Sequence, residues 1–139
     1  MDKKGYVYIL TNKNKTTLYI GVTSDLCRRV AEHKLHSNKG FSDKYNTEFL
    51  LYYEAFDLVV DAIAREKQLK KWHREWKDKM ISEFNPNWED LSEDIGVDDV
   101  YLKTMHLIRE FFGEVCRLVQ RIPAYAGMTL RCVGCLGEG

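Results

Sequence analysis

The sequence predicts an α+β fold with a small three-stranded antiparallel sheet flanked by helices. Two strand-like runs, separated by a short polar segment, open the chain, and a third such run follows one helix-length segment. Two stretches with helical periodicity come next, which gives the order β-β-α-β-α-α. An appended C-terminal helix and an irregular tail complete the prediction. This order lacks the regular βαβ alternation and the glycine-rich phosphate loop of dinucleotide-binding folds.

The first element expected is a β-hairpin. Residues 5–10 and 17–21 are rich in β-branched and aromatic side chains, and the segment between them is rich in Asn, Lys and Thr. A helix should follow, because Ser24 or Asp25 offers an N-cap and apolar residues then recur at helical spacing. Gly40 stands in the usual position for the end of this helix.

The third strand is expected over residues 48–56. This run is continuously apolar at its centre, as a buried member of a sheet is. Asp57 or Asp61 should open a long helix that breaks near His73 and then continues past residue 80. An Asn-Pro-Asn-Trp turn at residues 85–88 ends this part of the chain.

Charge is distributed unevenly along the chain, although its formal net charge is zero. Residues 1–82 hold 16 Lys or Arg against 11 Asp or Glu, whereas residues 83–99 hold seven acids and no Lys or Arg. A basic surface of this kind suits a phosphate backbone and is also common in ordinary soluble proteins. We expect one domain over residues 1–90. Residues 91–139 should then form an acidic linker, a helix over 100–118 and a tail outside the core.

Four cysteines, unevenly placed, do not form the disulfide framework of a small secreted domain. The N-terminal residues lead directly into a strand-like run, with no long apolar stretch. We therefore expect a cytoplasmic protein that does not enter a membrane.

Candidate site residues begin in the hairpin, where two strands carry the runs Tyr6 to Tyr8 and Tyr19 to Gly21. Strand tyrosines taken singly are usually half-buried packing residues. A hairpin, however, brings such side chains to one face of a sheet, and a glycine at a strand end allows another group to approach closely. Tyr8, Tyr19 and Gly21 are therefore candidates for one site.

Two further candidates lie on the first predicted helix. Arg29 and His33 are four residues apart, so they share a face. A guanidinium group offers paired donors to phosphate oxygens, and an imidazole can relay a proton. Glu66 lies beside the apolar stripe of the next helix, where a carboxylate needs a counter-charge or a metal. The alternatives are a solvated face for Arg29 and His33, and an ion pair with Arg65 or Lys70 for Glu66.

Taken in order and spacing, these residues resemble the GIY-YIG nuclease superfamily, and especially its small stand-alone bacterial members. Residues 6–8 stand for the first signature of the family and residues 19–21 for the second, and Arg29 follows Gly21 at the family's interval. The run from Ala64 to Trp72 and the Asn-Pro-x-Trp turn are also similar to the bacterial members. The resemblance covers about residues 4–90.

The resemblance implies a metal-dependent endonuclease that hydrolyses DNA phosphodiester bonds with an activated water. Mg²⁺ or Mn²⁺ would be held by Glu66, and a single carboxylate is enough for an ion that keeps most of its waters. Arg29 would stabilise charge on the phosphate. Tyr8 or Tyr19 would act on the water, and the sequence leaves open which of them does so.

The remaining residues that the resemblance assigns have supporting roles. His33 would be a second proton carrier or a phosphate contact, whereas Gly21 and Asn85 would order the site. The DNA would be branched, damaged or single-stranded, and specificity would come from the domain itself, a homo-oligomer or a protein partner.

Two departures from the family pattern keep an alternative open. Tyr6 stands where the family name has Gly, and Val22 stands where some relatives carry a lysine proposed to assist the base. The alternative is a catalytically weak or inactive nucleic-acid-binding module on the same fold. Another is an interaction protein whose acidic segment mimics nucleic acid and covers the basic face. Trp72, Trp76 and Trp88 are expected in the core or in a hydrophobic patch, with base stacking as the other role.

Overall fold

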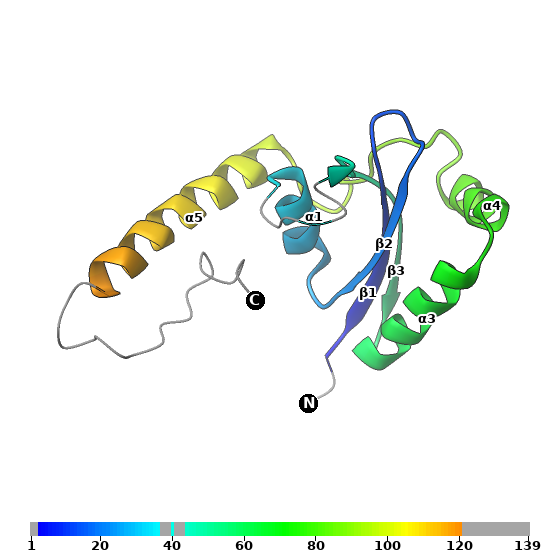
Figure 1. Cartoon of the computed structure of the whole chain (residues 1–139), viewed down its shortest axis with the longest axis horizontal. Helices are drawn as coiled ribbons and strands as arrows, with labels where there is room; N and C mark the ends of the chain where they lie inside the picture. Colours follow the sequence, from blue (N-terminus) through cyan, green and yellow to red (C-terminus); the bar gives the residue numbers. More distant parts are fainter. Residues whose placement is uncertain (1–2, 37–39, 41–43, 121–139) are drawn as a thin grey trace. The chain divides into compact units, whose positions relative to one another are not determined.

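The structure is a computed structural model that describes residues 3–36, 40 and 44–120, with side chains described as far as residue 112 (Figure 1). The chain divides into two compact units, Met1–Val97 and Asp98–Gly139, and each is described by itself. The sheet and the candidate site lie in the first unit.

A three-stranded antiparallel sheet forms the centre of the first unit, as predicted. Its strands are β1 (Gly5–Thr11), β2 (Leu18–Thr23) and β3 (Phe49–Phe56), in the order β2-β1-β3. The central strand is therefore the first in the chain, and β3 lies at an edge. Leu50, Leu51 and Tyr52 of β3 are nevertheless buried, which agrees with the burial predicted for this apolar run.

An irregularity in the pairing of β1 with β3 shapes the core. Ile9 pairs with Tyr52, but Leu10 pairs with Leu50, so Leu51 is left out of the register. Such a bulge breaks the strict alternation of side chains across a strand. Leu51 and Tyr52, although consecutive, consequently join the same hydrophobic cluster.

The first helix, α1 (Leu26–Lys34), is capped by Asp25, whose side chain accepts a hydrogen bond from the backbone N–H of Arg28. This decides between the two predicted caps. The predicted stop at Gly40 is wrong, because α1 ends at Lys34 with Leu35 as its C-cap. His36 follows with a φ of 50°, so the left-handed turn that Gly40 was expected to provide is made by a histidine.

Two consecutive helices, α3 (Val59–Lys71) and α4 (Arg74–Phe84), follow the sheet. The break predicted near His73 is confirmed. Neither Asp57 nor Asp61 caps α3, since the capping residue is Leu58 and makes no side-chain hydrogen bond. Figure 1 shows α1 on one side of the sheet and α3 with α4 on the other.

The alternation of side chains along β1 matches these two layers. Val7 and Ile9 belong to one buried cluster with Ala62, Leu69 and Ile81 of α3 and α4. The intervening residue, Tyr8, contacts α1 instead. Helices on both faces therefore bury the centre of the sheet, and this burial is the main source of its stability.

The first unit extends past residue 90, where the sequence suggested a boundary. Lys34 Nζ lies 2.6 Å from the Asp90 carboxylate, and the backbone N–H of Leu91 donates to the Leu50 carbonyl at 2.8 Å. Further on, Ser92 and Val97 are only 1% and 2% exposed. The residues just after position 90 are therefore packed against the domain and do not act as a linker.

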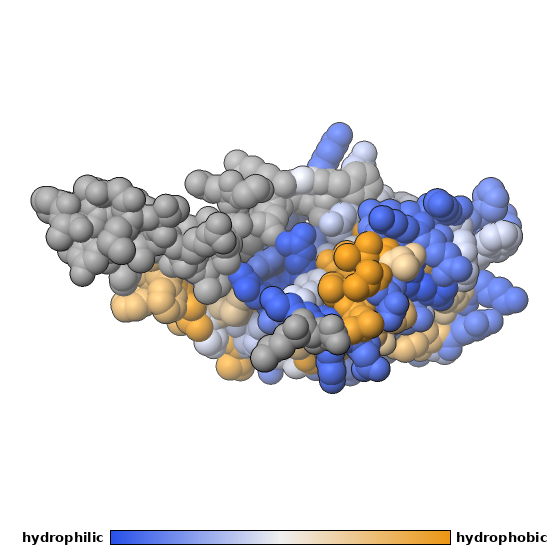
Figure 2. All heavy atoms as spheres, turned by 90° about the horizontal axis from the view of Figure 1, so that it is seen from below, coloured by the Kyte–Doolittle hydropathy of each residue, from blue (hydrophilic) through white to orange (hydrophobic). Residues whose placement is uncertain are grey.

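The second unit contains α5 (Asp99–Gln120), which covers the helix expected over residues 100–118. The predicted tail from residue 121 lies outside the described residues. In the part of the chain that the structure describes, no helix is long and apolar enough to cross a membrane. Figure 2 shows an apolar patch bordered mostly by hydrophilic residues.

Candidate active site

Tyr8 lies at the centre of the candidate site. Its position on the central strand leaves the residue only 1% exposed. Gly21 of β2 is its direct cross-strand partner, and a Cβ atom added to Gly21 would lie 2.4 Å from both the Cζ and the hydroxyl oxygen of Tyr8. The phenol ring therefore occupies the space above the glycine, which explains why this strand position has no side chain.

Two residues of α1 contact the Tyr8 hydroxyl. Arg29 Nε donates to this oxygen at 3.3 Å, and His33 Nε2 lies 3.1 Å from it. Because a guanidinium group can only donate, the oxygen of Tyr8 acts as acceptor towards Arg29. Its own proton is then available to His33 Nε2. The four-residue spacing predicted that Arg29 and His33 share a face, and the structure brings both to one hydroxyl.

Tyr19 completes the aromatic wall of the site. Its ring centroid lies 5.2 Å from that of His33 and 6.2 Å from that of Tyr8. Unlike Tyr8, Tyr19 is only partly buried. The structure thus brings together Tyr8, Tyr19, Gly21, Arg29 and His33 from β1, β2 and α1.

Burial sets the protonation states of this cluster at neutral pH. Desolvation is the largest cause that raises the pKa of Tyr8, the neighbouring Tyr19 adds to it, and Arg29 opposes it. Desolvation also lowers the pKa of His33 to about 4, with contributions from the charges of Arg29 and His36. Tyr8 is therefore protonated and His33 neutral, so Nε2 of His33 can accept the tyrosine proton.

The sequence did not identify one member of the site, Glu32. Its carboxylate bridges two arginines, with Oε1 3.2 Å from Arg28 Nε and Oε2 3.0 Å from Arg29 Nη1. The spacings of four and three residues were visible in the sequence, since such pairs are neighbours on a helix. Hydrogen bonds to Tyr8 and Glu32 outweigh the effect of burial and raise the pKa of Arg29, which remains a cation.

An open cavity adjoins this arginine pair. Its volume is about 390 Å³, and it lies where β2 ends and α1 begins, between Val22 and Glu32. Arg28 and Arg29 both line it. The cavity therefore gives a ligand access to the guanidinium group that contacts Tyr8.

Glu66 lies on α3, which packs on the other side of the sheet from α1. Its side chain is only 12% exposed and forms an ion pair with Lys70, whose side chain is 56% exposed. Within the described residues, no hydrogen bond or ion pair joins Glu66 to the Tyr8 cluster. The ion pair is the one that the sequence offered as the alternative to a metal ligand.

Asn85 orders the backbone near β3. It is 5% exposed, and its Nδ2 donates to the carbonyl of Leu51 at 3.3 Å and to that of Glu89 at 2.8 Å. Leu51 is the residue that the bulge leaves out of register, so Asn85 satisfies a carbonyl at the irregular point of the sheet. Its recorded contacts lie in the turn and in β3, away from Arg29 and His33.

The donor set fits only a metal that needs few protein ligands. Among the described residues, no group of three or more His, Cys, Asp or Glu side chains is arranged to hold an ion. Mg²⁺ commonly takes one or two carboxylates, with water and substrate phosphate as its other ligands. A largely buried single carboxylate such as that of Glu66 fits an ion of this kind.

Comparison with known proteins places this geometry in a family. A UPF0213 protein of Haloquadratum walsbyi is 32% identical over 83 residues, which cover 60% of this chain and 92% of that protein. Another, from Staphylococcus saprophyticus, is 34% identical over 83 residues and is covered over 99% of its length. A UPF0213 protein of Streptococcus pyogenes is 39% identical over 69 residues, or 50% of this chain and 74% of the relative.

The structural comparison finds the solution NMR structure of a UPF0213 protein from Bacillus halodurans, with a TM-score of 0.40 and 26% sequence identity over 63% of this chain and 92% of that one. Residues 4–80, more than half of the chain, match the GIY-YIG catalytic domain. This span contains the Tyr8 cluster and Glu66. The chain therefore belongs to the GIY-YIG family, a nuclease superfamily.

Proposed function

We propose that this protein is a metal-dependent endonuclease that hydrolyses DNA phosphodiester bonds with an activated water. The observation that carries the proposal is the Tyr8 hydroxyl, held between a neutral His33 and a permanently charged Arg29 that also lines an open cavity. Phosphodiester hydrolysis requires a cation near the phosphate and an acceptor for the proton of the attacking water. This cluster contains both.

Arg29 is proposed to bind the scissile phosphate. Its Nε donates to Tyr8 and its Nη1 to Glu32, and no described residue bonds to Nη2. The third nitrogen can therefore donate to a phosphate oxygen that enters the cavity. Because the guanidinium group remains charged, it would stabilise the negative charge that develops on the phosphate in the transition state.

Tyr8 and His33 are proposed to carry the proton. As the water oxygen forms its bond to phosphorus, the water loses a proton to the Tyr8 oxygen. The bond to the leaving oxygen breaks, and that oxygen takes a proton from solvent. Tyr8 passes its own proton to His33 Nε2, which is 3.1 Å away. This relay needs no free tyrosinate, which the raised pKa of Tyr8 disfavours. Tyr19 packs against His33 and would line the substrate side of the ring.

Glu66 is proposed as the ligand of Mg²⁺ or Mn²⁺. Such an ion supplies Lewis acidity, which lowers the pKa of a bound water and neutralises phosphate charge. The Glu66 carboxylate is largely buried and, among the described residues, forms an ion pair with Lys70. Lys70, whose side chain is 56% exposed, would move away into solvent for Glu66 to accept an ion, and the charge of that ion would replace the charge of Lys70 beside the carboxylate.

The test is cleavage of plasmid and oligonucleotide DNA with Mg²⁺ or Mn²⁺. Glu66→Gln, Arg29→Gln and Tyr8→Phe each keep the approximate size of the side chain and remove one proposed function. Glu89→Gln provides a matched control, because Glu89 is exposed and its recorded hydrogen bonds use only its backbone. Circular dichroism would verify that each variant is folded.

We expect metal-dependent cleavage that Arg29→Gln and Glu66→Gln reduce by about 100-fold or more and that Glu89→Gln leaves unchanged. Tyr8→Phe should cost more than Tyr19→Phe, because the proton relay uses the Tyr8 hydroxyl. DNA binding without cleavage, unaffected by Glu66→Gln, would contradict the proposal and favour a nucleic-acid-binding module.

A further inference from the structure

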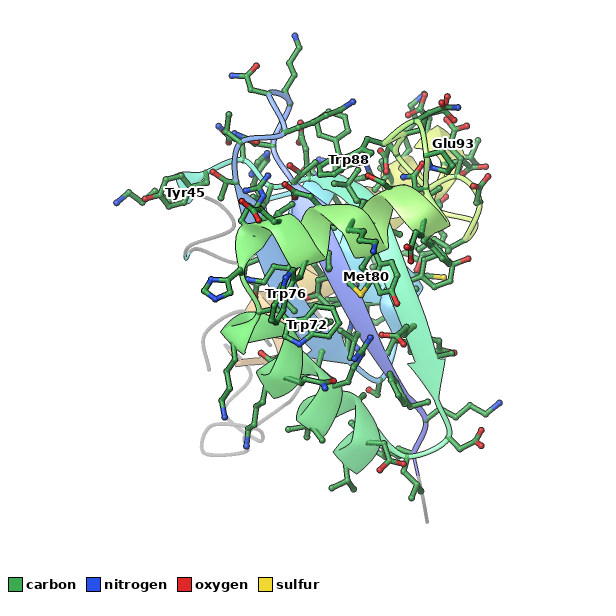
Figure 3. The ribbon with its side chains drawn as sticks, turned by 90° about the vertical axis from the view of Figure 1, so that its right-hand side faces the viewer. Tyr45, Trp72, Trp76, Met80, Trp88 and Glu93 are labelled. Carbon is green, nitrogen blue, oxygen red and sulfur yellow. The ribbon has the colours of Figure 1, made fainter. Side chains whose placement is uncertain are left out.

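A second surface feature lies where α3 meets α4, on the opposite side of the sheet from α1. It is a groove of about 340 Å³ whose lining includes Trp72, Trp76 and Met80. Trp76 is 56% exposed, which is unusual for so large an apolar side chain. Figure 3 shows the two tryptophans next to one another at the junction of the helices, with Met80 further along α4.

The aromatic side chains of the groove are held in place. The Trp72 and Trp76 rings meet edge to face with centroids 6.1 Å apart, and His73 meets Trp76 in the same way at 5.4 Å. Beneath them, the guanidinium carbon of Arg65 lies 5.2 Å from the centroid of Trp72, and an Arg65 nitrogen lies 3.7 Å from the Met80 sulfur. Trp76 is therefore oriented by its neighbours while more than half of its surface remains open to a ligand.

Positive charge surrounds this groove. The segment 67–79 contains six Lys or Arg and two acids, and one of those acids, Asp78, is paired with Arg74. Within the part of the chain that the structure describes, Lys71, Lys77 and Lys79 form no ion pair. Lys79 lines the groove itself, together with one acid, Glu83, so the excess of positive charge comes from the lysines and arginine around it. A ligand that fits here must offer negative charge to these lysines and a flat apolar surface to Trp76.

Single-stranded DNA has both properties. Its bases can stack on aromatic side chains, and its phosphates can pair with lysines beside the stacking site. A purely apolar partner would have to bury or displace the lysines without compensating their charge, which is unfavourable. An intact duplex keeps its bases stacked inside, so it can reach the lysines but not stack on Trp76.

We propose that the Trp72–Trp76–Met80 groove binds an unpaired nucleotide of the DNA substrate, with the base stacked on Trp76 and the flanking phosphates on Lys71 and Lys79. This inference rests on the proposed function, since it takes the ligand to be the substrate DNA. It narrows the substrate class to DNA with an unpaired stretch. It also places a substrate contact on the α3–α4 side of the sheet, away from the Tyr8 cluster.

The experiment measures binding of a fluorescent oligodeoxythymidine strand to the full chain by anisotropy, at low salt and without divalent metal, so that no cleavage occurs. An abasic strand of the same length has the same phosphates but no bases, and a blunt duplex has bases that are already stacked. The variant is Trp76→Ala. Phe84→Ala is the matched control, because Phe84 is an aromatic residue of the same helix, 46% exposed, that does not line the groove.

We expect Trp76→Ala to weaken binding of the oligodeoxythymidine about 5- to 100-fold and Phe84→Ala to leave it within about 2-fold. The abasic strand should bind more weakly than the normal strand and should not respond to Trp76→Ala. Equal binding of normal and abasic strands, or no effect of Trp76→Ala, would overturn the inference.

Failure of this inference can be told apart from failure of the proposed function. If Trp76 has no effect but cleavage still depends on Arg29 and Glu66, the groove is not a substrate site and the nuclease proposal stands. If binding depends on Trp76 and on bases but no metal supports cleavage, the groove binds DNA and the nuclease proposal fails.

Discussion

Replacement of Gly21 by alanine tests the geometry of the site most directly. The new Cβ would lie 2.4 Å from two atoms of Tyr8, about 1 Å closer than ordinary van der Waals contact allows. Tyr8 is 1% exposed, so its ring cannot swing out into solvent and must displace neighbouring core atoms when it shifts. A shift of that size stretches the contacts of 3.1 and 3.3 Å to His33 and Arg29 beyond hydrogen-bonding distance.

The expected loss of stability is about 2–4 kcal/mol, from overpacking of roughly 1–3 kcal/mol and the weakening of two hydrogen bonds. Urea unfolding would measure it, and DNA cleavage should fall by at least as large a factor as in Tyr8→Phe. Gly40→Ala is the control, because a Cβ there meets no atom of the described residues within 4 Å.

A double-mutant cycle identifies the cause of this loss. Tyr8→Leu removes the Cζ, Cε1 and hydroxyl atoms that the new Cβ would meet. In that background, Gly21→Ala should cost under about 1 kcal/mol, which leaves a coupling energy of roughly 1–3 kcal/mol. An equal cost of Gly21→Ala in both backgrounds would refute the reasoning, because the destabilisation would then arise from the strand and not from the contact with Tyr8.

Three further predictions concern the protonation, metal binding and boundary of the domain. Burial lowers the pKa of neutral His33 from 6.5 to about 4, so its contribution to stability is fully present above pH 6.5 and is lost as the pH falls towards 4. The loss is at most roughly 3 kcal/mol. Urea unfolding at several pH values should show this loss of stability, and the loss should be smaller in His33→Gln. Lys70→Gln should tighten Mn²⁺ binding about 2-fold, because the exposed Lys70 competes weakly for the Glu66 carboxylate. The signal of free Mn²⁺ in electron paramagnetic resonance measures this affinity, and an unchanged affinity would argue against Glu66 as the metal ligand. A chain that ends at residue 90 should melt roughly 10 °C below one that ends at residue 97, because it loses the buried Val97 side chain; equal melting temperatures would return the domain boundary to residue 90.

The elements of the fold were predictable because each depends on a local pattern. Alternation and aromatic content predicted the strands, and the break between α3 and α4 followed from the spacing of their apolar residues. The order of the strands depends on contacts between segments far apart in the sequence, so the edge position of β3 could not be inferred. The position of the domain boundary could not be inferred for the same reason, because it depends on contacts of Asp90 with Lys34 and of Leu91 with Leu50, which are far apart in the sequence.

The candidate site was predictable where its residues share one helix or one hairpin. Arg29 and His33 were placed together by helical spacing, and the hairpin register pairs Tyr8 with Gly21. Glu66 is different, because its position relative to the cluster depends on how α3 crosses the other face of the sheet. The sequence also could not show that Asn85 bonds to a bulged carbonyl, since nothing in the local pattern of β3 marks the bulge.

Glu32 shows why a spacing rule alone undervalues a residue. In the sequence, Glu32 and the two preceding arginines predict a pair of exposed ion pairs, each worth only about 0.3–0.5 kcal/mol. The structure adds the Tyr8 hydroxyl on the other side of Arg29, so this guanidinium is fixed at both Nη1 and Nε. An arginine side chain loses about 2 kcal/mol of conformational entropy when it is fully ordered. Glu32 and Tyr8 order Arg29 before any substrate is present. Binding of a phosphate therefore loses less conformational entropy, and the weak ion pair with Glu32 strengthens phosphate binding by holding Arg29 in position.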